Sequence, residues 1–177
     1  MRFINLFVYL PAAFAMIAGV MDWRTRRIPN WLTVSGLLVG LAANSLFRGW
    51  TGTKDSLLGA GLGLLVLLPF VLVRSLGAGD WKLVGALGAF LGPRPLLAVL
   101  FVAILVAGAM ALILIVWKGR LLQTVKNIAH MIAALFSFHL PGSELSLDNP
   151  AALKVPFGVA VAIAVVIYAI GRIWGVA

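Results

Sequence analysis

The chain has 177 residues, of which 63% are hydrophobic and only 11% charged; it has no Cys and a formal net charge of +9. Soluble domains carry about 25% charged residues, so this composition excludes a water-soluble globule and a disordered segment. The remaining class is an all-α polytopic membrane protein. At about 20 residues per helical span, the length allows about six transmembrane helices, and we expect residues 1–177 to form one transmembrane domain without a separate soluble domain.

Six apolar runs follow one another along the chain, and they lack the alternation of transmembrane β-strands. The runs cover residues 3–21, 31–47, 56–76, 81–92, 95–117 and 155–174. The fourth run is short: as a helix it reaches only about 18 Å, against about 30 Å for the hydrocarbon core. It therefore begins inside the membrane or stops short of the far side. The first run resembles a secretory signal peptide, but it continues unbroken to Met21 and five runs follow, which favours an uncleaved span.

The stretch 120–140 differs from these runs because polar and basic residues interrupt its first half. We expect an interfacial amphipathic helix there, with a buried span as the alternative. Residues 141–154 form the longest polar loop.

Basic residues predict the orientation, because cytoplasmic loops carry an excess of Lys and Arg. Placing 22–30, 74–82 and 118–154 in the cytoplasm puts nine basic residues on that side and five on the other. Both termini then face outward. Since the basic residues stand at the ends of apolar runs, we expect them to meet membrane lipid and not nucleic acid.

Two of the five acidic residues stand at membrane boundaries. Asp22 directly follows the first run and Asp80 opens the fourth, so both lie at the predicted cytoplasmic end of their helices. A charge at such a boundary is costly unless it is paired or used. Ion pairs with nearby basic residues, such as Arg26 or Lys82, are the structural alternative. The other acids lie in polar stretches, where we expect solvated loop charges: Asp55, Glu144 and Asp148.

Two carboxylates that meet share one proton and titrate as a pair. The ionised member draws a proton from water while the protonated member hydrogen-bonds the carbonyl under attack, which is hydrolysis without a metal or a covalent intermediate. Gly77 and Gly79 precede Asp80 and leave room for an extended backbone. On the other side, Pro29 forms a turn and Asn30 is placed to cap the next helix.

Other chemistries fit poorly. His130 and His139 lack a zinc-binding spacing, and the sequence has no nucleophilic-serine motif, so we expect no metal and no cofactor. Glycine pairs four residues apart, at 36 and 40, 59 and 63, and 88 and 92, predict close packing of helices.

Two segments resemble those of the type IV prepilin peptidases, integral-membrane aspartic peptidases with a GxGD motif. They are residues 22–30 (Asp-Trp-Arg-Thr-Arg-Arg-Ile-Pro-Asn) and 77–82 (Gly-Ala-Gly-Asp-Trp-Lys). A third, weaker match is residues 154–158 (Lys-Val-Pro-Phe-Gly), where Val159 departs from the usual Pro.

The resemblance implies that Asp22 and Asp80 are the catalytic dyad, at the cytoplasmic face of a bacterial inner membrane. Its substrates would be prepilins or pseudopilins, cleaved just before their hydrophobic N-terminal helix. The absence of Cys and the start at the first span resemble the short branch that serves tight-adherence (Flp) pili, for which we expect no methyltransferase activity. The residues that the resemblance places around the dyad are Gly77, Gly79, Lys82, Arg27, Pro29, Asn30, Lys154 and Pro156.

Three alternatives stay open from the sequence. A non-catalytic assembly subunit of a pilus or secretion system would have almost the same sequence. A small transporter would need ionisable groups near the midplane, which the runs 56–73 and 96–117 lack. A peptidase of the presenilin or signal-peptide-peptidase type would lack the Ile-Pro-Asn and Lys-Val-Pro-Phe-Gly pieces.

Overall fold

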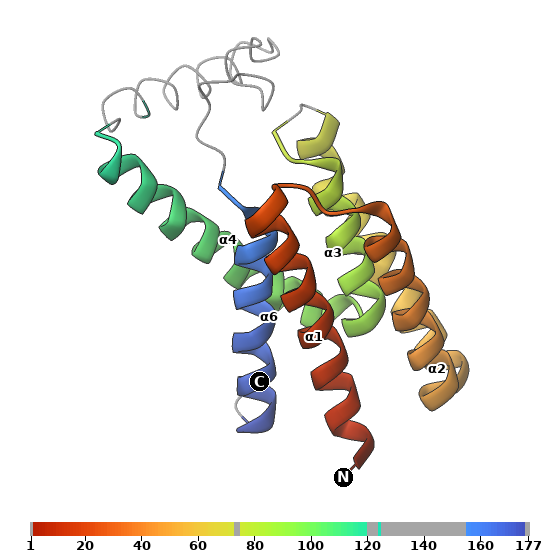
Figure 1. The fold of residues 1–177 in the computed structure, drawn as a ribbon. Helices are drawn as coiled ribbons and strands as arrows, with labels where there is room; N and C mark the ends of the chain where they lie inside the picture. Colours follow the sequence, from red (N-terminus) through yellow and green to blue (C-terminus); the bar gives the residue numbers. More distant parts are fainter. Residues whose placement is uncertain (1, 73–74, 120–123, 125–154, 176–177) are drawn as a thin grey trace.

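The computed structural model describes residues 2–72, 75–119, 124 and 155–175, and the secondary structure in these residues is helical (Figure 1). This confirms the all-α prediction for the described part of the chain. The helices, in chain order, are α1 (Arg2–Thr25), α2 (Asn30–Leu72), α3 (Ala78–Leu91), α4 (Pro93–Trp117) and α6 (Phe157–Ile173).

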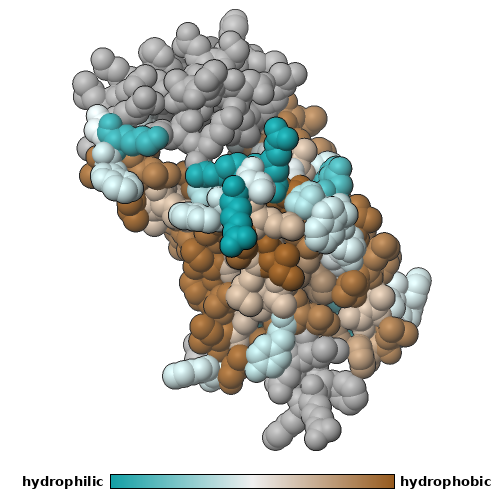
Figure 2. All heavy atoms as spheres, in the orientation of Figure 1, coloured by the Kyte–Doolittle hydropathy of each residue, from teal (hydrophilic) through white to brown (hydrophobic). Residues whose placement is uncertain are grey.

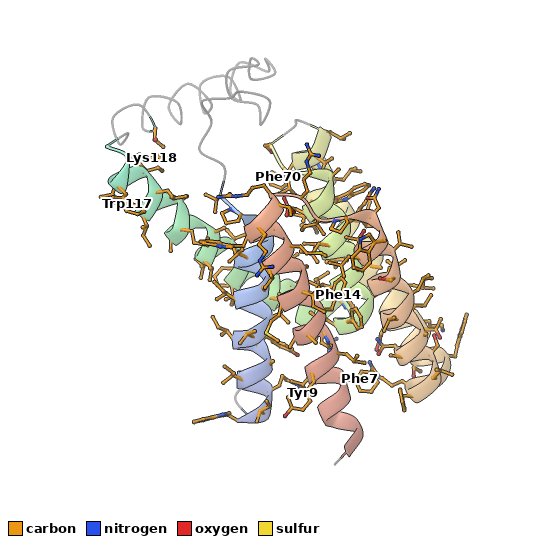
Figure 3. The ribbon with its side chains drawn as sticks, viewed as in Figure 1. Phe7, Tyr9, Phe14, Phe70, Trp117 and Lys118 are labelled. Carbon is orange, nitrogen blue, oxygen red and sulfur yellow. The ribbon has the colours of Figure 1, made fainter. Side chains whose placement is uncertain are left out.

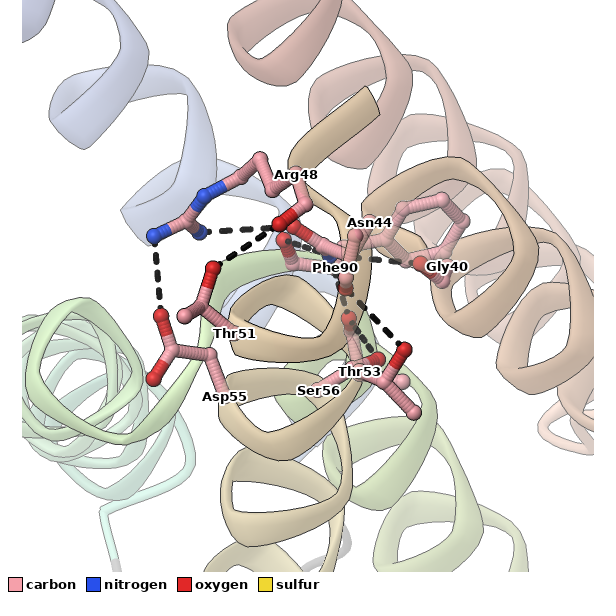
Figure 4. Close-up of polar contacts among 10 residues, drawn as sticks. Gly40, Asn44, Arg48, Thr51, Thr53, Asp55, Ser56 and Phe90 are labelled. Carbon is pink, nitrogen blue, oxygen red and sulfur yellow. Dashed lines mark hydrogen bonds and ion pairs between the residues drawn. The ribbon is translucent and has the colours of Figure 1, made fainter. Parts of the chain in front are cut away.

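Helix α2 contains two of the predicted spans, because it doubles back at Gly49. Gly49 has φ 60° and ψ −146°, a backbone conformation that favours glycine. The polar stretch 48–55, which the sequence predicts as a loop, is helical on both sides of this kink. The prediction of a loop at Asp55 is therefore wrong, although its side chain is 43% exposed to solvent. Asp55 Oδ2 accepts a hydrogen bond from Arg48 Nη2 at 2.8 Å, across the kink (Figure 4).

Helix α3 is the centre of the bundle. Its residues from Leu83 to Phe90 are all buried, as expected for a short helix that is apolar on every side. Phe14 of α1 packs on Phe90, with ring centroids 5.3 Å apart, and Figure 3 shows Phe14 directed from α1 toward α3. The helix begins at Ala78, three residues before the predicted run, so Asp80 lies in its first turn.

Glycines allow α2 and α3 to approach closely. A Cβ atom at Gly59 would overlap the carbonyl oxygen of Gly88, and a Cβ at Gly88 would overlap the backbone of Gly59. Asn44 and Ser56, one from each arm of α2, both donate hydrogen bonds to the carbonyl oxygen of Ala89, at 2.9 and 2.5 Å (Figure 4). The predicted close packing therefore occurs between α2 and α3 at Gly40, Gly59, Gly63 and Gly88, whereas Gly36 of the first pair packs on Phe14 of α1.

Two of the described helices, α2 and α4, are long and apolar enough to cross a membrane. Helix α4 diverges from the bundle (Figure 1) and exposes large apolar side chains such as Phe101, Ile104 and Trp117, which suit contact with lipid. Figure 2 shows hydrophobic side chains over most of the flank, with hydrophilic ones gathered near the end where α1 finishes. The predicted helix at 120–140 lies outside the described residues, apart from Thr124, and the number of spans stays a prediction.

The helix ends form two groups (Figure 1). One end of the molecule holds the end of α1, the start of α3, the end of α4 and the start of α6. The other end holds both termini, the kink of α2 and the turn between α3 and α4. The basic residues predict this same division into two sides; which side faces the cytoplasm stays a prediction.

Candidate active site

Asp22 lies in the last turn of α1 and is buried, with 6% of its surface exposed. The backbone N–H of Gly158, at the start of α6, donates a hydrogen bond to Asp22 Oδ2 at 2.9 Å. A Cβ atom at position 158 would lie 2.9 Å from the Cβ of Asp22. The start of α6 can therefore approach this carboxylate because residue 158 has no side chain.

Asp80 lies in the first turn of α3, after the extended residue Gly77. Trp81 fixes this turn on α2, because its indole Nε1 donates a hydrogen bond to the carbonyl oxygen of Leu64 at 2.7 Å. On the opposite side, a Cβ atom at Gly79 would lie 3.3 Å from Ile28. The backbone of α3 at Gly79 therefore packs directly against Ile28 in the loop after α1.

The two carboxylates line one open cleft of about 320 Å³. Two separate parts of the chain form its walls: the last turn of α1 with the loop that follows it, and the start of α3 with the residue before it. The residues that line it are Asp22, Arg26, Arg27, Ile28, Gly77, Ala78, Gly79 and Asp80. The structure thus brings together the two acids that are 58 positions apart in the sequence, together with three of the predicted supporting residues.

The two acids have different electrostatic surroundings. Both lie just outside the predicted spans 3–21 and 81–92. Burial raises the pKa of Asp80 to about 7, and the nearby charge of Asp22 contributes to this rise. Burial also raises the pKa of Asp22, but backbone hydrogen bonds from Gly158 and Val159 and the charge of Arg26 oppose the rise. At Asp80 both causes favour the protonated form, whereas at Asp22 the raising and lowering contributions oppose each other, so Asp22 ionises more readily than burial alone would allow.

The position of Asp80 in the first turn of α3 acts in the opposite direction, because a helix N-terminus stabilises a negative charge. That effect is worth about 0.3–1 kcal/mol, which corresponds to less than about one pKa unit. It is smaller than the rise of the Asp80 pKa from 3.8 to about 7. The pKa of Asp80 therefore stays well above its ordinary value, and its carboxyl gains and loses its proton close to neutral pH.

Four other predicted residues lie around the cleft and not on its wall. Lys82 Nζ donates a hydrogen bond to Asn30 Oδ1 at 2.9 Å, which ties α3 to the start of α2. Pro29 and Asn30 line a neighbouring cleft with Arg27. Pro156 is the N-cap residue of α6, and its carbonyl oxygen accepts a hydrogen bond from the N–H of Val159. Lys154, His130 and His139 lie outside the described residues.

The prediction that Asn30 caps the next helix is wrong. The N–H groups of Leu32 and Thr33 donate to the carbonyl oxygen of Pro29 instead, and the side-chain oxygen of Asn30 accepts from Lys82. The turn at Pro29 satisfies these helix N–H groups itself, which leaves Asn30 available for a contact with α3.

Sequence reasoning missed the contacts of Gly158 and Ile28. Both residues occur in the quoted motifs, yet nothing in a motif says which helix a backbone N–H will meet. A signal was present in the small residue at 158 directly after Pro-Phe at the start of a span. Within the described ranges, no three His, Asp or Glu side chains gather in a way that could hold a metal ion.

Known proteins with similar sequences point to a single family, the leader peptidases. The sequence profile described as "Type IV leader peptidase family" matches residues 9–113. A "Prepilin leader peptidase/N-methyltransferase" of Burkholderia pseudomallei is 35% identical over 122 residues, which cover 62% of this chain and 39% of the relative. Proteins of the same name from Pectobacterium carotovorum and Escherichia coli are 34% and 33% identical, over 43% and 55% of their lengths.

The chain thus spans about two fifths of the length of the first of these relatives. No solved structure gives a significant match. The profile covers more than half of the chain and includes both cleft acids, Asp22 and Asp80. The chain belongs to the type IV leader peptidase family.

Proposed function

We propose that this protein is a membrane aspartic endopeptidase that removes the leader peptide from prepilin or pseudopilin precursors, with Asp22 and Asp80 as its catalytic dyad. The observation that carries the proposal is the cleft itself, in which two carboxylates from separate helices lie together. Family membership supports the reaction class, and the relatives named above are prepilin leader peptidases.

The roles of the two acids follow from their surroundings. Asp22, which accepts the N–H of Gly158, is the ionised member and takes a proton from the attacking water. Asp80 holds the shared proton and donates it to the oxygen of the scissile carbonyl, on whose carbon the water oxygen forms its new bond. When the tetrahedral intermediate collapses, the C–N bond breaks and the leaving amine takes the proton from Asp22. The diol hydroxyl that becomes the carbonyl of the new carboxyl group returns its proton to Asp80, so Asp22 is again ionised and Asp80 again protonated.

The substrate backbone needs clearance beside the dyad, and the wall at Gly77–Ala78–Gly79 supplies it. Side chains are absent at two of these three positions, so an extended peptide can lie close to Asp80. Arg26 and Arg27 line the same cleft and face a substrate or the lipid phosphates. Lys82 acts indirectly, through its hydrogen bond to Asn30, and holds α3 at the distance from α2 that the cleft requires.

The cellular setting is also part of the proposal. The protein would lie in the bacterial inner membrane as a multi-pass protein, with the dyad at the cytoplasmic surface, as the distribution of basic residues predicts. We further propose that it serves the tight-adherence (Flp) pilus branch, which its Cys-free sequence resembles, and that it releases an unmethylated N-terminus.

The test is processing of a candidate prepilin, co-expressed in a host without its own prepilin peptidase. Asp22→Asn and Asp80→Asn should each lower the cleavage rate by roughly 10²–10⁴-fold, because each removes one proton-transfer group. Asp148→Asn is the matched control, with the same carboxylate-to-amide change in a polar stretch, and should cleave at the wild-type rate. The mass of the product also shows whether its N-terminus is methylated.

Membrane levels of each variant must match the wild type for the comparison to hold. If the wild-type chain does not process any prepilin, the proposed peptidase activity is wrong, and a non-catalytic assembly subunit becomes the better interpretation of the structure. If either dyad variant cleaves at the wild-type rate, the assignment of that acid is wrong.

A further inference from the structure

A second cavity lies at the opposite end of the molecule from the dyad. It is an open cavity with a volume of about 600 Å³, lined by the kink of α2, the start of α4, the last turns of α6, the early part of α1 and the end of α3. Arg48, Arg94 and Arg172 line it, one from each of the first three elements. Nothing in the peptidase mechanism uses this cavity.

The cavity carries a positive charge. Asp55 also lines it, so the lining side chains, three Arg and one Asp, have a formal net charge of +2. Arg48 Nη2 donates to Asp55 Oδ2 at 2.8 Å and Nη1 donates to Asn44 Oδ1 at 3.4 Å (Figure 4). These two bonds fix the position of the Arg48 guanidinium, while its side chain remains 47% exposed. A guanidinium has five N–H donors, so others can bind a ligand.

The N-terminus of α4 adds to the positive electrostatic potential in this cavity. Its N-cap residue is Gly92, which has no side chain to cap the helix, and Pro93 begins the first turn. The positive end of the α4 macrodipole therefore acts on the same cavity without a neutralising acidic residue in the first turn. Arg94, in that turn, is exposed.

The remaining wall is largely apolar and aromatic. Phe7 and Tyr168 line it beside the arginines, and exposed apolar side chains such as Ile167 and Leu97 lie on the flanks of the same helices. A free inorganic anion would need the arginines but no such wall. A phospholipid needs both, because its phosphodiester seeks guanidinium groups while the adjoining glycerol and acyl chains seek apolar surface.

The distribution of charge along the chain supports the same conclusion. The predicted non-cytoplasmic side has five basic residues, and three of them converge on this one cavity. Three arginines from separate elements, drawn together on the side that ordinarily carries fewer basic residues, call for an anionic partner on that side.

We propose that this cavity binds the phosphodiester head group of an anionic phospholipid, with Arg48, Arg94 and Arg172 as its cationic ligands and Phe7 and Tyr168 against the start of the acyl chains. The proposal does not depend on peptidase activity, and requires only that the chain lies in a bilayer. Failure of the dyad experiment would leave it intact.

The experiment measures lipid binding to the full-length chain in detergent, by native mass spectrometry with phosphatidylglycerol, phosphatidylcholine or inorganic phosphate as the probe. Wild type should retain phosphatidylglycerol in preference to phosphatidylcholine. Arg94→Gln should weaken phosphatidylglycerol binding about fivefold, because one basic residue contributes about 1 kcal/mol to binding at an anionic lipid surface. Arg94→Gln combined with Arg172→Gln should weaken it about thirtyfold, which is the product of two such losses. Arg24→Gln, the matched change at the other end of the molecule, should leave it unchanged.

Three results would overturn the proposal. One is equal retention of the two lipids by the wild type, a comparison that needs no variant to fold. Another is wild-type affinity in the double variant. The third is displacement of phosphatidylglycerol by inorganic phosphate at equal concentration, which would show that the cavity takes a free anion instead of a lipid.

Discussion

Asp22 and Asp80 show how much of the candidate site single residues reveal in the sequence. Their positions at the edges of apolar runs are enough to select them, because a charge at a membrane boundary needs a partner or a use. The sequence does not show that the surroundings of Asp22 and Asp80 differ. The N–H that binds Asp22 comes from Gly158, 136 positions away, and such a contact depends on the packing of α1 against α6, which no local pattern encodes.

This difference predicts a pH dependence for cleavage. In the proposed mechanism Asp80 must be protonated to donate to the substrate carbonyl, and its pKa is raised to about 7 by burial and by the charge of Asp22. As the pH rises through this value, Asp80 loses its proton and cleavage should fall, by about tenfold per pH unit well above the pKa. The measurement is the initial rate of precursor cleavage by the protein in liposomes between about pH 5 and pH 9.

Helix content, followed by circular dichroism over the same range, separates titration from unfolding. A rate that declines while the helix signal stays constant supports the assignment. A rate that is level between about pH 7 and pH 9 would contradict the role given to the Asp80 proton.

At the scale of elements, the contact between α2 and α3 positions Asp80 and was largely predictable. The glycines at 59 and 88 indicate close packing in the sequence, and the structure pairs them directly. Spacing does not reveal which glycine of a run is used: Gly61 belongs to the same Gly-rich stretch, yet no atom lies within 4 Å of its ideal Cβ. The helical conformation of 48–55 was also missed, because its glycines and polar residues resemble a loop while Ser56 and Asn44 hold it against Ala89.

Gly59 and Gly61 form a matched pair for a stability test. Gly59→Ala places a Cβ against the carbonyl oxygen of Gly88 and should destabilise the protein by about 1–3 kcal/mol, as overpacking does. Gly61→Ala meets open space and should stabilise the helix by about 0.5–1 kcal/mol, because alanine loses less backbone entropy. Unfolding in mixed micelles, followed by helix content, measures both free energies.

Since Gly59→Ala pushes α3 away from α2, the same variant should also lower precursor cleavage, whereas Gly61→Ala should not. Equal stability of the two variants would mean that the α2–α3 contact adjusts without cost, and that the position of Asp80 does not rest on it.

At the scale of the whole molecule, the charges along the sequence predict which segments share an end, and the structure groups the helix ends in that way (Figure 1). The divergence of α4 from the bundle could not be predicted, because α4 is apolar on every side and periodicity then gives no preferred face. The result is a molecule with acidic chemistry at one end and an arginine-lined cavity at the other. The proposed cleavage on the cytoplasmic side requires these ends to lie on opposite membrane surfaces.

The chain has no Cys, so single cysteines can report this orientation without background. Lys118 follows α4 at the dyad end, and Lys54 lies near the α2 kink at the other; both are exposed. In spheroplasts, a membrane-impermeant maleimide should label Lys54→Cys directly and Lys118→Cys only after permeabilisation, because the excess of basic residues keeps the dyad end inside. Labelling in the reverse order would place Asp22 and Asp80 on the outer surface, away from a cytoplasmic leader peptide. Labelling of both from outside would mean that the two ends do not lie on opposite surfaces, and would contradict the arrangement on which the proposed function depends.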